Sequence, residues 1–229
     1  MELFHVRWED IPDNATLIMG FSGWGNLGHL VMNHLAEVLP VEPVGFFGNS
    51  TWYHKGRLEA PMTLYQYIQG EQKYLFLCPR VMFPVVGEEA LQSEFWELLV
   101  EDMLSIEGLE QVIIIAGLRE ETRSFGNKDW LALIPTKDYK EKFGIKRSLE
   151  NHLSMVGPLS VTLMKATADK VPALAILGYC GTYQADYVAA KVVLGALEEF
   201  TGLRVRREHI IEFDATFITE PIEDLEDFI

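Results

Sequence analysis

Three side chains could form a nucleophilic centre. Cys180 follows an apolar run and precedes a helical pattern, and a helix N-terminus can lower the pKa of a thiol. His29 could then act as the base, with Asp186 orienting it. The sequence does not bring Cys180 and His29 together, and a lone cysteine after a strand is more often a small packed residue. We therefore expect a protein that is not an enzyme, and we assign no catalytic residue.

A glycine-rich stretch raises a second kind of chemistry. GWGNLG at 23–28 matches G-x-G-x-x-G between an apolar run and a helical pattern, which is the place of a dinucleotide-binding turn. Such a site also needs an acid at the end of the second strand to bind the ribose. The nearest acid, Glu42, lies before that strand, and Trp24 places an indole where the pyrophosphate would approach. We predict that the chain binds no dinucleotide and no other cofactor.

Three interpretations of this loop stay open. The glycines allow a tight turn from strand to helix, with Asn26 as the N-cap of the helix. The free N–H groups of that helix could instead bind an anion. Trp24 could also anchor an interface with another protein.

The loops that follow the strands are where a ligand site would lie. The alternative to an interaction protein is a small-molecule-binding protein or hydrolase that uses the loops 20–28, 117–123 and 178–186. The candidate ligand-binding residues are Gly23, Trp24, Gly25, Asn26, Arg119, Arg123, Tyr183 and Asp186. The structural interpretation is that the arginines pair with the glutamates between them and that Asp186 favours a helix dipole. His29 and His34 are five residues apart without a zinc pattern, so we predict no metal site.

The hydrophobic pattern predicts strands that alternate with helices. Short apolar runs predict strands at 16–21, 44–47, 63–68, 74–78, 112–116, 131–134 and 173–177. The third and fourth read as a hairpin, and 112–116 reads as a central strand covered on both faces. Periodic apolar residues predict helices at 27–39, 88–106, 158–170 and 185–200. The predicted apolar face of 88–106 includes Leu98, and that of 185–200 includes Val188.

This alternation predicts an α/β fold, a three-layer α/β/α sandwich whose hairpin makes the sheet mixed. We find no linker or repeat, so we expect one domain over 1–229. The stretch 119–156 reads as an elaborated loop with a short helix. The acidic tail 214–229 reads as partly disordered.

Charge narrows the choice of partners. The net charge of −15 argues against nucleic acid and anionic membranes, which need a basic surface. Eight acids and no Lys or Arg lie at 88–110, and the same holds at 208–229. The stretch 119–150 holds eight Lys or Arg against six acids, and such opposed patches can guide self-association. Two cysteines without metal spacing, no membrane-spanning run and no signal peptide predict a cytoplasmic protein with reduced thiols.

Several motifs together resemble one family. They are GFSGWGNLG at 20–28, IIAGL at 114–118, GPLS at 157–160, VPALAILG at 171–178 and DYVAAKVVLGALEEFTGLRV at 186–205. Their order and spacing are similar to those of the proteasome assembly chaperone 2 (PAC2) family, and the resemblance covers about residues 15–206.

The resemblance implies a phosphorylase/hydrolase-like α/β/α fold, a homo-oligomer, and a role in assembly of the proteasome core. Those chaperones dock on proteasome α subunits through a C-terminal tripeptide of a hydrophobic residue, Tyr and any residue. Here the last residues are Asp227, Phe228 and Ile229, so the motif is degenerate: Phe228 lacks the hydroxyl and Asp227 is a charge that is costly to bury. Phe228 and Ile229 are the candidate partner-binding residues.

Overall fold

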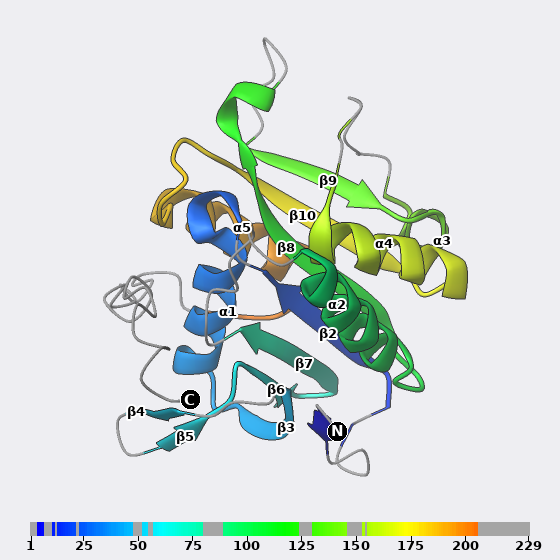
Figure 1. Cartoon of the computed structure of the whole chain (residues 1–229). Helices are drawn as coiled ribbons and strands as arrows, with labels where there is room; N and C mark the ends of the chain where they lie inside the picture. Colours follow the sequence, from blue (N-terminus) through cyan, green and yellow to red (C-terminus); the bar gives the residue numbers. More distant parts are fainter. Residues whose placement is uncertain are drawn as a thin grey trace.

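The computed structural model describes residues 4–6, 11, 13–21, 23–47, 52–54, 57–79, 89–123, 130–145, 153 and 155–205. Within these residues an eight-stranded sheet has the order β1-β3-β6-β7-β2-β8-β10-β9, and β4 and β5 form a separate two-stranded sheet (Figure 1). The strands are β1 (Phe4–Val6), β2 (Ala15–Gly20), β3 (Glu42–Phe47), β4 (Trp52–His54), β5 (Arg57–Glu59), β6 (Met62–Gln69), β7 (Gln72–Pro79), β8 (Gln111–Arg119), β9 (Leu131–Pro135) and β10 (Ala173–Cys180).

The sheet is mixed, as the sequence predicts. Strands β7, β2, β8 and β10 are parallel neighbours. Antiparallel pairs flank them, with β6, β3 and β1 on one side and β9 on the other. The predicted hairpin is the β6–β7 pair, in which Gln69 lies opposite Gln72. The parallel centre brings the carboxyl ends of four strands to one edge of the sheet.

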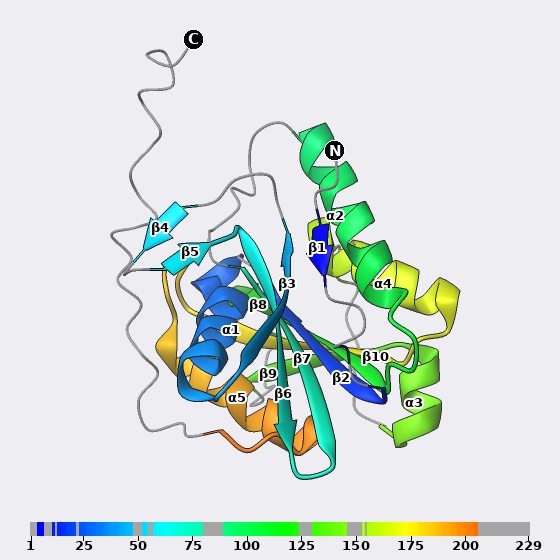
Figure 2. The same ribbon diagram turned by 90° about the horizontal axis from the view of Figure 1, so that it is seen from below.

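Helices cover both faces of the sheet, and the three layers are visible in Figure 2. Helices α1 (Leu27–Val38) and α5 (Tyr187–Thr201) lie on one face, and α2 (Glu89–Leu104) and α4 (Gly157–Asp169) lie on the other. Each face has its own apolar core. The fold is therefore the predicted three-layer α/β/α sandwich. No helix in the described ranges has the length and apolar character that a membrane crossing requires.

Strand β8 shows why an unbroken apolar run belongs at the centre. Its four residues at 112–115 are fully buried. Val112 and Ile114 pack into the core beneath α2 and α4, while Ile113 and Ile115 pack into the core beneath α1 and α5. Successive side chains of a strand point to opposite faces, so a strand covered on both sides needs no polar residue.

Two predicted helix faces need correction. On α5 the apolar stripe includes Val188, but this side chain is 72% exposed, and Ala190 and Leu194 are buried instead. Val188 lies in the first turn of the helix. On α2, Leu98 is 41% exposed and Trp96 is buried in its place, while Leu99 and Met103 of the predicted face are buried as expected.

Some elements escaped the sequence patterns. Strands β1, β4 and β5 are three residues each, too short to show alternation. Within the predicted elaborated loop, α3 (Lys137–Phe143) is the expected short helix, with Thr136 as its N-cap and Gly144 as its C-cap. The tail 214–229 lies outside the described residues, so its partial disorder stays a prediction.

Strand β9 forms one end of the described sheet. The carbonyl of Trp130 accepts from Tyr179 N–H, and Thr136 N–H donates to the carbonyl of Ala173. Antiparallel pairs alternate in this way, so the backbone groups of Leu131, Leu133 and Pro135 point away from β10. Pro135 has no N–H to present there.

Candidate functional site

The chain changes direction across the sheet between β2 and β8. From β2 it passes through α1 on one face to β3, β6 and β7. From β7 it passes through α2 on the other face to β8, on the opposite side of β2. In open α/β sheets the crevice at the carboxyl ends of two such strands is the usual ligand site. The three predicted loops 20–28, 117–123 and 178–186 meet at this edge.

The glycine loop forms a 3-10 turn, η2 (Trp24–Asn26), that runs into α1. Gly25 (φ 65°) and Asn26 (φ 47°) both have left-handed backbones, which Asn adopts more readily than most residues. Asn26 occupies the N-cap position of α1, but its side chain makes no capping hydrogen bond, so the predicted capping role is wrong. Asn26 N–H donates instead to the carbonyl of Gly23, and Leu27 N–H donates to that of Trp24.

The turn fills the crevice with its own backbone. The carbonyl of Trp24 lies where a Cβ of residue 117 would be, so this close approach requires Gly117. A Cβ on Gly25 would meet the thiol of Cys180 and come within 3.2 Å of the Asp186 Cβ. Asp186 N–H donates to the carbonyl of Gly25 at 3.0 Å. The glycines therefore serve close packing of the turn against β8 and β10, in the space that a pyrophosphate would need.

Aromatic rings and arginines lie at the same edge of the sheet as this turn, near the ends of β8 and β10. The guanidinium carbon of Arg119 lies 4.4 Å from the Trp24 ring centroid, and that of Arg123 lies 4.6 Å from the Trp130 ring centroid. The ring of Tyr183 meets Trp24 edge-on, with 4.9 Å between centroids. All three contacts are favourable. A cation is attracted to the face of an aromatic ring, and two rings prefer an edge-to-face arrangement. We call these five residues the arginine–aromatic patch.

The proposed nucleophile does not have the environment of one. Cys180 is buried, and its Sγ lies 3.5 Å from the carbonyl of Gly178 and 3.7 Å from that of Trp24. Burial, and to a lesser extent the Asp186 carboxylate, raises the pKa of the Cys180 thiol to about 12. A thiol with this pKa is almost fully protonated at neutral pH, whereas nucleophilic attack needs the thiolate. His29, the predicted base, is buried in α1.

Asp186 has a structural role at this edge. Its Oδ1 accepts from Ala189 N–H at 2.9 Å, which makes it the N-cap of α5. Its Oδ2 accepts from Gly181 N–H at 3.2 Å. The expectation that this carboxylate favours the helix N-terminus agrees with the geometry.

The structure brings together some of the predicted site residues. Trp24 contacts both Arg119 and Tyr183, and the Gly25 carbonyl accepts from Asp186 N–H, while Gly23 and Asn26 lie in the same glycine loop. Arg123 pairs with Glu120 at 3.2 Å and stacks on Trp130, a residue that the sequence did not single out. The predicted partner-binding residues Phe228 and Ile229 lie outside the described residues.

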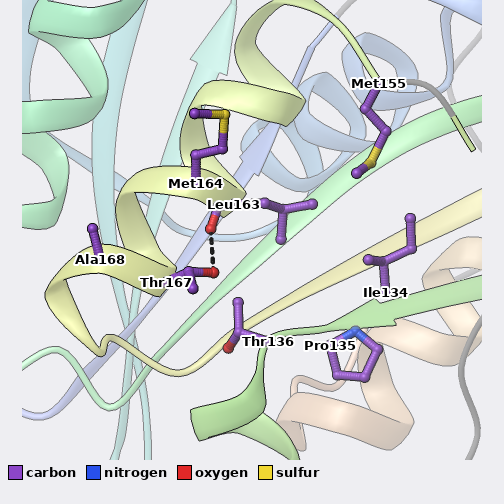
Figure 3. Close-up of a pocket in the computed structure, with 8 residues that line it drawn as sticks. All are labelled: Ile134, Pro135, Thr136, Met155, Leu163, Met164, Thr167 and Ala168. Atoms are coloured by element: carbon purple, nitrogen blue, oxygen red, sulfur yellow. Dashed lines mark hydrogen bonds between the residues drawn. The ribbon is translucent and has the colours of Figure 1, made fainter.

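A groove lies between α4 and the edge strand β9 (Figure 3). This α4–β9 groove has a volume of about 440 Å³. Its lining is Ile134, Pro135, Thr136, Met155, Leu163, Met164, Thr167 and Ala168.

The two threonines give the groove little polarity. Thr167 donates to the Leu163 carbonyl, and Thr136 Oγ1 accepts from Tyr139 N–H and Ala173 N–H. Sequence reasoning missed the groove because no motif marks it. The one available signal is apolar residues on α4 that are left outside the core, such as Met164, which is 70% exposed.

The sequence profile of the PAC2 family matches residues 17–226. The chain belongs to the PAC2 family. The resemblance noted from its motifs is therefore confirmed. No curated protein matches the chain by sequence.

Solved structures share the fold along most of their length. PbaA of Pyrococcus furiosus, an archaeal homolog of proteasome-assembly chaperone, is 21% identical with a TM-score of 0.70, covering 90% of this chain and 89% of PbaA. PbaB of the same organism, an archaeal proteasome activator, is 16% identical with a TM-score of 0.71, covering 92% of this chain and 93% of PbaB. A proteasome-assembly chaperone homologue of Mycobacterium tuberculosis is 14% identical with a TM-score of 0.59, covering 85% and 89%. At these identities the likeness establishes the fold.

Proposed function

We propose that this chain is an oligomeric, non-enzymatic interaction protein that acts in proteasome assembly or activation. The observation that carries the proposal is membership of the PAC2 family over residues 17–226. PbaA and PbaB, whose fold it shares, are a homolog of a proteasome-assembly chaperone and a proteasome activator. The partners would be further copies of this chain and proteasome α subunits, in the cytoplasm, with 1–229 acting as one domain.

The geometry of the carboxyl edge supports a role by contact. The crevice is filled by the backbone of Trp24 and Gly25, and burial raises the pKa of the Cys180 thiol to about 12. The exposed side of the same edge carries Arg, Trp and Tyr side chains, the residue types that contribute most to protein interfaces.

Binding to proteasome α subunits is the direct test. Affinity-tagged chain should retain α subunits from the organism that encodes it, and the oligomeric state should exceed a monomer in light scattering. A variant that lacks residues 225–229 tests tail docking. Equal retention by the full chain and this variant would rule out docking through Phe228 and Ile229, and no retention by either would reject the proteasome as partner.

The alternative is a small-molecule-binding protein or hydrolase at the same loops. The convergence of the three loops on the β2–β8 crevice favours it. Thermal unfolding with nucleotides and phosphorylated metabolites tests it, because a bound ligand raises the melting temperature. Stabilisation that Arg119→Gln abolishes would favour this alternative over a protein partner.

A further inference from the structure

The arginine–aromatic patch is built as an exposed surface. Trp130 is 51% exposed and Tyr183 is 60% exposed, so both rings present large apolar areas to solvent. Each arginine is held against a ring, Arg119 on Trp24 and Arg123 on Trp130. Stacking fixes the plane of a guanidinium and leaves its N–H edges available for an acceptor. The patch combines ordered cations with exposed aromatic area.

The hydrogen-bond donors that the patch offers belong to its two guanidinium groups. Arg123 Nη2 forms an ion pair with Glu120 Oε1 at 3.2 Å. Within the part of the chain that the structure describes, Arg119 has no carboxylate partner, although the chain as a whole carries a net charge of −15. A guanidinium binds carboxylate and phosphate through paired N–H donors.

The backbone around the patch favours carboxylate over phosphate. Phosphate sites use several free backbone N–H groups, as at a helix N-terminus or an anion nest. Four backbone N–H groups around the patch are engaged within the fold: those of Asn26 on Gly23, of Arg123 on Glu120, of Gly181 on Asp186 and of Gln184 on Thr182. The guanidinium groups of Arg119 and Arg123 offer paired side-chain donors, which suit carboxylates carried on a peptide with apolar side chains beside them.

We propose that the patch docks the acidic segment 208–229 of the same molecule. This segment has eight Asp or Glu and no Lys or Arg, and Phe and Ile are interleaved with the acids. Its carboxylates match the two guanidinium groups, and its apolar side chains match the exposed faces of Trp130 and Tyr183.

The chain is long enough for this contact within one molecule. Helix α5 ends at the opposite edge of the sheet, where the Thr201 carbonyl accepts from the Tyr74 hydroxyl near the start of β7. The eight residues of β10 span about 26 Å between the two edges. The 24 residues after Val205 reach up to about 80 Å when extended. This contact would form in the free chain, without a proteasome partner.

Photo-crosslinking of the full chain tests this contact. A benzophenone amino acid replaces Tyr183, and a second variant carries it at Met164 on α4, an equally exposed position away from the patch. Cross-links from position 183 should map by mass spectrometry to 208–229, and those from position 164 should not. Mixing isotope-labelled and unlabelled chain separates links within one molecule from links between two. Links only between copies, links to other surfaces, or links to 208–229 from both positions would overturn the proposal.

Charge variants test the chemistry of the contact. Arg119→Gln should lower the yield from position 183 about two- to fivefold, as expected for one exposed ion pair. Lys140→Gln on α3 is the matched control and should leave the yield unchanged. Arg119→Glu should lower the yield further, and Glu223→Lys with Asp224→Lys should restore it. A yield that Arg119→Gln leaves unchanged, or that inorganic phosphate abolishes at constant ionic strength, would overturn the assignment to a carboxylate peptide.

Discussion

The carboxyl edge of the sheet and the α4–β9 groove differ in one respect that matters for binding: one is filled and the other is open. At the carboxyl edge of β2 and β8, where an α/β sheet ordinarily binds a ligand, the chain has filled the crevice with η2. Between α4 and β9, an apolar groove of about 440 Å³ is open. The first region carries the motif GFSGWGNLG, whereas none of the residues that line the groove belongs to a family motif. A glycine motif that matches a dinucleotide-binding loop can therefore serve close packing of a turn against the sheet.

The largest expected effect is on the alkylation rate of Cys180, which lies in the filled crevice at the carboxyl edge. The pKa of the Cys180 thiol rises from 9.0 to about 12 in the fold, so its thiolate fraction at pH 8 should be roughly a thousandfold lower than in the unfolded chain. Alkylation of Cys180 by iodoacetamide, mapped by mass spectrometry, should be slower in native protein by at least that factor. An alkylation rate in native protein equal to that in guanidinium would show that η2 opens and does not close the crevice around Cys180.

The same shift has a consequence for stability. The folded pKa is raised, so the contribution of the protonated thiol is fully present below about pH 9 and is lost as the pH rises from 9.0 towards 12. Burial also raises the pKa of Tyr74 to about 12, so both groups oppose folding in strong alkali.

Gly117→Ala should produce the next largest effect. The new Cβ would occupy the place of the Trp24 carbonyl, and displacing this backbone should cost about 3 kcal/mol in free energy of unfolding. Gly23→Ala is the matched control, because nothing lies within 4 Å of a Cβ there, and it should change stability by less than about 0.5 kcal/mol. Urea unfolding of both variants measures the difference. Equal stabilities would mean that η2 is not packed against β8.

Asp186→Ala should have a smaller effect on the free energy of unfolding. It removes the N-cap of α5 and the acceptor for Gly181 N–H, which should cost about 1–2 kcal/mol. Asp186→Asn keeps an oxygen acceptor and should cost clearly less. If the two substitutions are equally destabilising, charge at the helix N-terminus matters more than the capping hydrogen bond.

The open groove should respond least in stability and most in surface binding. Met164→Asp places a charge at an exposed position and should change the free energy of unfolding by less than about 0.5 kcal/mol. It should lower the fluorescence of a bound apolar dye roughly twofold, because the dye binds exposed apolar surface. Val188→Asp on α5, which is 72% exposed but outside the groove, should leave the dye signal unchanged. Equal losses in both variants would show that the groove is not a preferred binding surface.

Local patterns predicted the layers of the fold well. The unbroken run at 112–116 predicted the buried strand β8, and the hairpin and four long helices lie within a few residues of their expected ranges. These features depend on periodicity, which sequence displays directly. The misplacement of Val188 has a tertiary cause: its apolar spacing continues the stripe, but the side chain is left outside the core that the rest of the stripe enters.

The candidate site was predicted in part. The rule that loops after parallel strands meet at one edge brought Trp24, Arg119 and Tyr183 together correctly. It did not predict that backbone would fill the crevice, because that depends on the left-handed conformations of Gly25 and Asn26. Trp130 was missed since it directly precedes β9, outside the three loops that the rule selects, and the groove was missed since it exists only once α4 and β9 are placed.

The missing N–H of Pro135 bears on how this sheet can meet another chain. On its outer side β9 can offer donors only at Leu131 and Leu133, because the next outward-facing position is the proline. A strand from a second molecule could pair with β9 over only a few residues, because Pro135 of β9 offers it no N–H. An edge that pairs over so short a length resists open-ended sheet growth. The open groove beside β9 can then remain apolar without inviting fibre-like association through the neighbouring backbone.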